Sequence, residues 1–176
     1  MNLILMLLKN FKKIAVKFLE IVLIATVGVL VIDVLWGVVS RYVLSGQSSW
    51  TDDLASMLLI WEVLLGSAYA FGQKAHLGVD YLVEKFDSFS KCMTALFVNI
   101  VCVTFAVAVF IYGGTQEVLT AFESQQMIIS LGVPKAYVYL AIPVTGLFFV
   151  MFGVEAFFEE LVKLKNGEAT VATEEN

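Results

Sequence analysis

The chain has 176 residues, of which 60% are apolar and only 15% are charged, and its mean hydropathy is +0.88. This composition lies far outside that of soluble domains and predicts an integral membrane protein. The net charge of −5 is carried outside the apolar segments, and the sequence has no basic nucleic-acid patch, phosphate-binding loop or nucleophile–base spacing. These features argue against an enzyme and against a nucleic-acid-binding protein.

Four segments reach the ~20 mostly apolar residues that a membrane-spanning helix requires. Their expected bounds are residues 18–44, 53–72, 93–117 and 134–160. The first is too long for a signal peptide and lacks a small-residue cleavage site, so we expect it to be retained. In the fourth, Pro143 has no backbone N–H to donate, which predicts a kink. The expected fold class is an all-α membrane protein with four transmembrane helices, in a membrane domain over residues 18–162.

Two further segments are amphipathic at helical spacing without being able to span a membrane. In residues 1–17, apolar side chains such as Phe11 follow one stripe, and the lysines lie away from it. Residues 79–91 place apolar side chains such as Phe86 opposite charged ones. A helix in the headgroup plane has two such faces, so we expect two interfacial helices on the cytoplasmic side. The alternative is that each segment continues its neighbouring span into water. Residues 163–176 are expected to form an acidic flexible tail.

The cysteines and the histidine predict no metal or cofactor site. Cys92 and Cys102 lie ten residues apart on one expected helix, about 15 Å along it, so they cannot form a disulfide with each other. His76 is the single histidine, which leaves no spacing for a metal site or for a two-histidine haem anchor. We therefore expect no cofactor in this chain.

The distribution of basic residues predicts the orientation in the membrane. Nine lysines fall on the side of both termini and of the loop between the second and third spans, whereas only Arg41 and Lys135 fall on the other side. Cytoplasmic loops carry the excess of lysine and arginine. Both termini are therefore expected in the cytoplasm, with residues 45–51 and 123–133 in the periplasm.

Two acids, Asp33 and Glu62, lie inside expected spans. Asp33 precedes Arg41 by eight residues and Glu62 follows Asp52 by ten, which predicts a similar depth of about 12–15 Å for both. A charged acid at mid-bilayer costs about 2.5 kcal/mol or more. Three interpretations remain open: a protonated or hydrogen-bonded acid that joins helices, an acid that meets donors of a partner subunit, and a proton or sodium relay.

Small and aromatic residues complete the set of candidates. Trp61, Gly66 and Ala70 accompany Glu62 on the second span, where small residues allow a close approach of another helix. Asp52 and Asp53 are adequately explained as first-turn acids that complement a helix dipole. Aromatic residues near the ends of the apolar segments are expected to be anchors at the membrane interface. These anchors are Trp36, Tyr42, Trp50, Phe11 and Phe86.

An ordered set of short motifs resembles a known family. The motifs are Trp36 with Ser40-Arg41-Tyr42-Val43, Trp50 with Asp53-Leu54-Ala55, Trp61 with Gly66-Ser67-Ala68-Tyr69-Ala70, His76-Leu77-Gly78-Val79-Asp80, and Ser130-Leu131-Gly132-Val133-Pro134. Together they are similar to the small, Q-type (DctQ-like) membrane subunit of tripartite ATP-independent periplasmic (TRAP) transporters. The resemblance covers about residues 20–160. One departure is the pair Asp52-Asp53, where a glutamate is expected.

The resemblance implies a role that the spacing of residues alone does not. Such subunits accompany a large transmembrane permease subunit, which carries the sodium and substrate sites and moves them by an elevator motion. A periplasmic substrate-binding protein delivers an organic acid, such as a sialic acid or a four-carbon dicarboxylate. The small subunit is then a scaffold in the bacterial inner membrane, in contact with lipids, with no catalytic residues and no nucleic-acid partner.

Two outer loops are the candidates for docking the binding protein, because they form the expected periplasmic face. Their polar and basic residues are Arg41, Ser48, Ser49, Gln125, Gln126 and Lys135. The rival interpretation is a self-sufficient, homodimeric four-span antiporter that uses Glu62 or Asp33 as its proton site. The length and the lack of internal repeats argue against this. A membrane anchor for a redox enzyme would need haem ligands that one histidine cannot supply.

Overall fold

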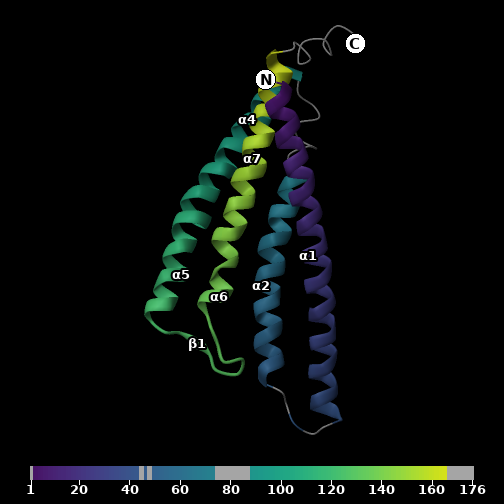
Figure 1. Ribbon diagram of the computed structural model, residues 1–176, viewed down its shortest axis with the longest axis vertical. Coiled ribbons are helices and arrows are strands. Elements are labelled where there is room, and N and C mark those ends of the chain that lie inside the picture. The colour runs from purple at the N-terminus through teal and green to yellow at the C-terminus, as the bar shows by residue number, and fades with distance from the viewer. Residues whose placement is uncertain (1, 44–45, 47–48, 74–87, 166–176) are drawn as a thin grey trace.

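The computed structural model describes residues 2–43, 46, 49–73 and 88–165. Its helices are α1 (Asn2–Tyr42), α2 (Ser49–Gly72), α4 (Ser88–Phe105), the π-helical segment η1 (Ala106–Gly113), α5 (Gly114–Glu123), α6 (Ala136–Tyr139) and α7 (Ala141–Lys165). Two short strands, β1 (Met127–Ile128) and β2 (Val133–Pro134), pair antiparallel between α5 and α6. The N-terminal end of α1 and the C-terminal end of α7 lie at one end of the molecule, opposite this hairpin (Figure 1).

Four helical segments of the described residues are long and apolar enough to cross a membrane. They are Leu8–Tyr42, Ser49–Gly72, Met93–Glu123 and Ala136–Val162. The expected all-α fold with four membrane-spanning helices is therefore confirmed. The third is longer than expected, because η1 and α5 continue α4 to Glu123.

The N-terminal segment is not a separate interfacial helix in this structure. Residues 2–42 form one continuous helix, α1, whose first glycine is Gly28 and which contains no proline. Its N-terminal part lies against α7, where Lys12 Nζ is 2.8 Å from Glu155 Oε2. The absence of a helix breaker and this ion pair explain why the amphipathic stretch continues the span. For the second expected interfacial helix, residues 79–87 lie outside the described residues, and residues 88–91 belong to α4.

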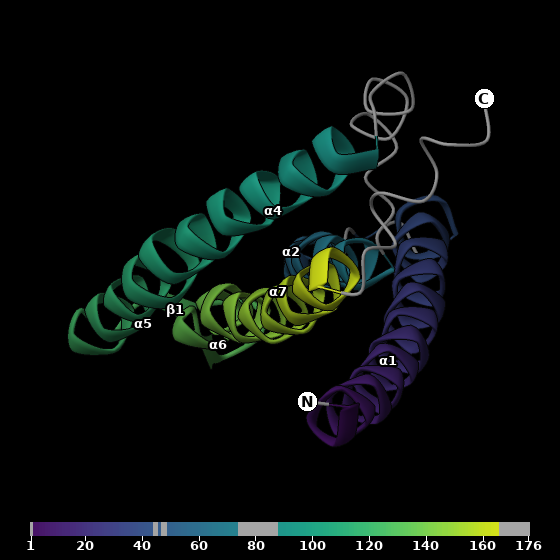
Figure 2. The ribbon, with the colours of Figure 1, turned by 90° about the horizontal axis from the view of Figure 1, so that it is seen from above.

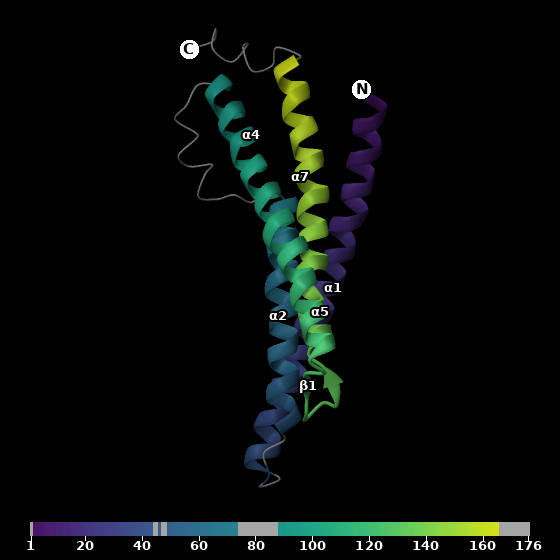
Figure 3. The ribbon, with the colours of Figure 1, turned by 90° about the vertical axis from the view of Figure 1, so that its left-hand side faces the viewer.

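The α7 helix joins the other three spans. The α1–α2 pair lies on one side of α7, and the long α4–η1–α5 helix lies on the other. Seen from above and from the side, α7 lies between α4 and α1 (Figures 2 and 3). The last span is interrupted at Leu140, between α6 and α7, three residues before Pro143. This position fits the loss of the hydrogen bond to the Tyr139 carbonyl, so the expected irregularity near Pro143 is confirmed.

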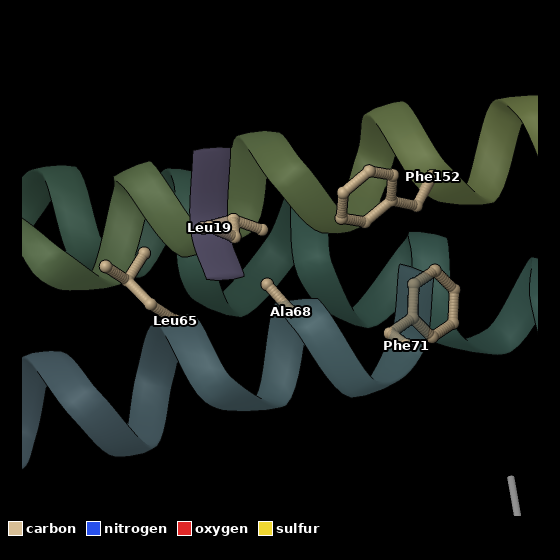
Figure 4. Packing of buried hydrophobic residues seen from close by; sticks show 5 residues of the cluster. All are labelled: Leu19, Leu65, Ala68, Phe71 and Phe152. Atoms are coloured by element: carbon tan, nitrogen blue, oxygen red, sulfur yellow. The ribbon is translucent and has the colours of Figure 1, made fainter. Parts of the chain in front are cut away.

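The core lies where α1, α2 and α7 meet. It consists of the buried side chains of Leu19, Leu65, Ala68, Phe71 and Phe152 (Figure 4). Gly72 makes room for the Phe152 ring, because a Cβ atom at this glycine would come within 2.9 Å of the ring. Close packing of this kind drives helix association in lipid, where apolar burial alone gives little.

Glycines of α7 bring the α4–η1–α5 helix close. A Cβ atom at Gly153 would lie 2.2 Å from Val103 Cγ2, and one at Gly146 would lie 2.8 Å from Phe110 Cβ. Asn99 Nδ2 donates a hydrogen bond of 2.8 Å to the Gly153 carbonyl. These contacts fix how α4 and η1 pack on α7.

Candidate functional site

The register of α1 against α2 determines where the two intramembrane acids lie. Gly37 packs against Thr51, since a Cβ atom at this glycine would be 3.2 Å from Thr51 Oγ1. Thr26 Oγ1 is hydrogen-bonded to Glu62 Oε2. These two contacts lie eleven residues apart on each helix, so the helices pair in one register over this length.

The register overturns the expectation that Asp33 and Glu62 share one depth. Asp33 is one turn from Gly37, near the outer end of the α1–α2 seam. Glu62 pairs with Thr26, which lies seven residues before Asp33 in α1 and therefore further from that end. Glu62 is therefore about 10 Å deeper than Asp33. The expectation failed because both depths were counted from Arg41 and Asp52, and α1 extends beyond the start of α2.

Glu62 has a partner within this chain. Thr26 Oγ1 also lies 3.0 Å from the carbonyl oxygens of Val22 and Leu23. A threonine hydroxyl has one hydrogen and can also accept one. A protonated Glu62 can donate to Thr26 Oγ1 while the hydroxyl donates to its own helix, so a neutral acid is satisfied as well as a charged one.

Asp33 is in a different environment. Its side chain is only 5% exposed, and within the described part of the chain neither carboxylate oxygen has a hydrogen-bond partner. The indole Nε1 of Trp61 is likewise buried without an acceptor among those residues. A buried polar group without a partner is costly. The structure thus separates two acids that the sequence analysis treated as equivalent.

The small residues of α2 divide into an inner and an outer set. Ala68 and Gly72 are buried in the core, against α1 and α7. Gly66 has no atom within 4 Å of where its Cβ would be, and Ala70 is exposed. Among the described residues, no other helix therefore packs closely on Gly66 and Ala70, which lie on the outer side of α2.

Two polar contacts that hold helices together were not anticipated. Glu155 is buried in α7 and pairs with Lys12 of α1, and Lys9 Nζ lies 4.0 Å from Glu159 Oε1. The signal for the first was present, since Glu155 is an acid in an apolar stretch of the last span. Lys12 was expected only on the polar face of the interfacial helix and among the charges that set the orientation.

The candidate docking residues lie at the end of the molecule that carries the β hairpin. Arg41, Ser49, Gln125 and Lys135 are exposed, Gln126 is half-buried, and Ser48 lies outside the described residues. Ser130 Oγ is hydrogen-bonded to Asp53 Oδ2, which ties the hairpin to the first turn of α2. At the tip, Ile129 is 94% exposed. The hairpin and the start of α2 are thus held together at this end of the molecule.

The expected interface anchors are placed on the outside of the helices. Trp36, Tyr42 and Phe11 are strongly exposed, and Trp50 is exposed beside the first turn of α2. Phe86 lies outside the described residues. Their exposure is consistent with anchoring at the membrane interface. No other observation tests this role.

A groove of about 770 Å³ lies between α2, η1 and the start of α7. It is lined by Leu59, Ile60, Val63, Leu64, Val109, Phe110, Gly113, Gly114, Glu117, Tyr139 and Ile142. Glu117 is its one charged residue, and no lysine or arginine lines it. An apolar groove with a single carboxylate is unsuited to an organic anion. The residues that the structure describes contain no cluster of His, Cys, Asp and Glu that could hold a metal ion.

The fold and these surfaces define a multi-pass helical membrane subunit. Comparisons with known proteins agree. The family described as Tripartite ATP-independent periplasmic transporters, DctQ component, matches residues 29–163. Over 166 residues, 94% of each chain, the protein is 26% identical to the sialic acid TRAP transporter small permease protein SiaQ of Vibrio cholerae. Over 77 residues, 44% of this chain and 48% of the other, it is 34% identical to a TRAP transporter small permease protein of Haemophilus influenzae whose name marks the assignment as provisional.

The chain belongs to the DctQ family, the small permease subunits of TRAP transporters. This confirms the resemblance and the expectation that the protein is a transporter component and not an enzyme. Membership in a tripartite system implies two partners, a large permease subunit and a periplasmic binding protein.

Proposed function

We propose that this chain braces the large permease subunit of a sodium-driven TRAP transporter that imports an organic acid. The observation that carries the proposal is the outer surface of α1. Apolar side chains along its membrane-spanning part are exposed, although α2 and α7 cover its inner side. They include Ile21, Ile24, Val27, Val31, Ile32, Leu35 and Val38. Together with Gly66 and Ala70 of α2, this surface offers the large subunit a long helix face to pack on.

The transported acid and the coupling ion are assigned to the partner. The apolar groove of the described residues has no cation to bind a carboxylate. A sialic acid is our preferred substrate, because the relative matched over 94% of both chains is named for it. A four-carbon dicarboxylate is the other candidate.

We place the subunit in the bacterial inner membrane with both termini in the cytoplasm, on the strength of the lysine excess at that end. The 41 residues of α1 extend over about 60 Å, about twice the thickness of a hydrocarbon core. The basic N-terminal part of α1 would then stand in the cytoplasmic headgroup region. An interfacial helix over residues 79–91 stays a prediction.

We assign docking of the loaded binding protein to the end of the molecule with the β hairpin. The hydrogen bond between Ser130 and Asp53 supports this assignment, because it ties the hairpin to the first turn of α2. Exposed Arg41 and Lys135 supply positive charge there for an acidic surface of the binding protein.

The test is reconstitution into proteoliposomes with an inward sodium gradient. Three preparations are compared: this chain alone, the chain with its large subunit, and the pair with the binding protein loaded with a sialic acid or a dicarboxylate. We expect uptake only from the complete system. Uptake by the chain alone would refute the scaffold role and favour the homodimeric antiporter.

A further inference from the structure

A basic pocket lies between α1 and the end of α2, on the side of the molecule that carries both chain ends. Its volume is about 410 Å³, and four lysines of α1 line it: Lys9, Lys12, Lys13 and Lys17. Val16 and Glu20 of α1 complete that wall, and Gly72 and Gln73 of α2 close the other side. The pocket shares no lining residue with the apolar groove, and it borders the outer surface of α1 assigned to the large subunit at Ile21 and Ile24.

The lysines of this pocket are not equivalent. Lys12 is paired with Glu155, and Lys9 lies at the 4.0 Å limit from Glu159. Lys13 and Lys17 are exposed, and neither forms an ion pair with any residue that the structure describes. Among the described residues, Glu20 and the two paired acids offset three of the four lysines, so one positive charge remains. The pocket therefore matches a ligand with a single negative charge.

Lys13 and Lys17 also repel each other. They are four residues apart on α1, so their ammonium groups lie on one face, and like charges at this spacing destabilise a helix. An anion between them removes the repulsion. Helical side chains point toward the N-terminus of their helix. The side chains of Lys13 and Lys17 therefore point away from the long apolar stretch of α1 that begins at Phe18.

The same face of α1 becomes apolar immediately below the lysines. Ile21 follows Lys17 by four residues, Ile24 continues this face, and both are largely exposed. A charged group held by Lys13 and Lys17 therefore has an apolar strip beneath it. This combination distinguishes an amphiphile from a small soluble anion.

We propose that this pocket binds the phosphodiester of a monoanionic phospholipid, with phosphatidylglycerol as the representative headgroup. Lys13 and Lys17 bind the phosphate, and one acyl chain lies along Ile21 and Ile24. Basic pockets between transmembrane helices on the cytoplasmic side bind anionic headgroups by the same physics. The lipid would rest against both α1 and the end of α2, and it would stabilise the junction of these two helices.

The test measures lipid retention by the purified full chain with native mass spectrometry, in micelles doped with either phosphatidylglycerol or phosphatidylcholine. We expect one phosphatidylglycerol per chain to be retained in preference to phosphatidylcholine. The variant Lys13→Gln/Lys17→Gln should bind it about 30-fold more weakly, because each lysine near a membrane surface contributes about a fivefold factor. The matched control Lys135→Gln removes one lysine at the other end of the molecule and should change binding little.

Thermal unfolding supplies the second readout. Phosphatidylglycerol should raise the melting temperature of the wild type and of Lys135→Gln, but not that of the double variant. Without lipid, the double variant should melt no lower than the wild type, because glutamine is a good helix former and the repulsion is gone. Equal retention of the two lipids, or undiminished retention by the double variant, would overturn the proposal. So would an equal rise with inorganic phosphate, which would identify a site for free anions.

Discussion

Lys12 Nζ lies 2.8 Å from Glu155 Oε2 and joins the first helix of the chain to the last. The Glu155 side chain is only 4% exposed, and that of Lys12 is 19% exposed. An ion pair in such a site is well shielded from water. The loss of one partner therefore leaves the other charge buried and uncompensated.

We expect Lys12→Met to lower the free energy of unfolding by about 3 kcal/mol, because Glu155 is left buried without its partner. The double variant Lys12→Met/Glu155→Met should recover most of this loss. Denaturant titration of the detergent-solubilised chain measures both. The control is Lys9→Met, whose side chain is 57% exposed and whose nearest acid atom is 4.0 Å away, and it should cost little. A double variant as unstable as Lys12→Met would contradict this account.

Glu62 is expected to be structural. Glu62→Gln keeps a group that can bond Thr26, so assembly and uptake should stay close to those of the wild type. Glu62→Leu should cost about 1 kcal/mol, since the threonine hydroxyl can still donate to its own helix. Thr26→Val should cost about as much, and the two losses should not add. An assembled but inactive Glu62→Gln complex would instead identify a proton or sodium relay.

Asp33 should respond differently, since no described residue donates to it. In the isolated chain, Asp33→Leu should be at least as stable as the wild type, because the substitution removes a buried, unsatisfied carboxyl group. A loss caused by Asp33→Leu is therefore expected in the assembly with the large subunit and not in the isolated chain. Copurification with the large subunit measures it: a loss with Leu and not with Asn would show that the partner supplies donors. Destabilisation of the isolated chain would refute the assignment.

Gly153 and Gly66 form a matched pair of glycines in two spans. Gly153→Ala places a methyl group where Val103 lies, so it should cost about 1–3 kcal/mol of stability. Gly66→Ala meets nothing within 4 Å and should leave the isolated chain unchanged or stabilise it by up to about 1 kcal/mol. Thermal unfolding compares them. If Gly66 faces the large subunit as proposed, Gly66→Ala should weaken copurification with that subunit. Gly153→Ala should instead lower the melting temperature of the isolated chain.

The orientation can be measured with single cysteines, after Cys92 and Cys102 are replaced by serine. Ile129→Cys lies at the tip of the hairpin and Asn10→Cys on the exposed side of α1. In intact spheroplasts, an impermeant thiol reagent should modify only the cysteine at position 129, because the lysine-rich end is expected in the cytoplasm. Lysed cells provide the control, in which both positions should react. The reverse pattern would invert the topology.

Hydropathy was sufficient to predict the four spans, since twenty apolar residues in a row have few alternatives to a transmembrane helix. It does not report which residues of two spans face each other. The register that separates Asp33 from Glu62 depends on Gly37 packing against Thr51, a contact between two helices that hydropathy does not report. The family resemblance carried the function, because the site residues alone left three interpretations of the acids open.

Other features could not be predicted from the sequence, for local reasons. An amphipathic stretch predicts an interfacial helix and an extended span equally well, and the ion pair with Glu155 favours the second in this structure. The π-helical segment Ala106–Gly113 contains no proline and has its one glycine at the end, so its sequence did not predict it. It packs where Gly146 lets α7 approach. Lys12 was interpreted as a charge that sets the orientation in the membrane, although it also makes a tertiary contact with Glu155.

The central position of α7 has a consequence for how the subunit is made. This helix contacts α1, α2, α4 and η1, and it follows the other three described spans in the chain. The α1–α2 pair can form early, but the packing that joins it to the α4–η1–α5 helix through Gly146, Phe152 and Gly153 exists only once α7 has been inserted. Three inserted spans are therefore an unfinished assembly, and insertion of the fourth is the event that closes it.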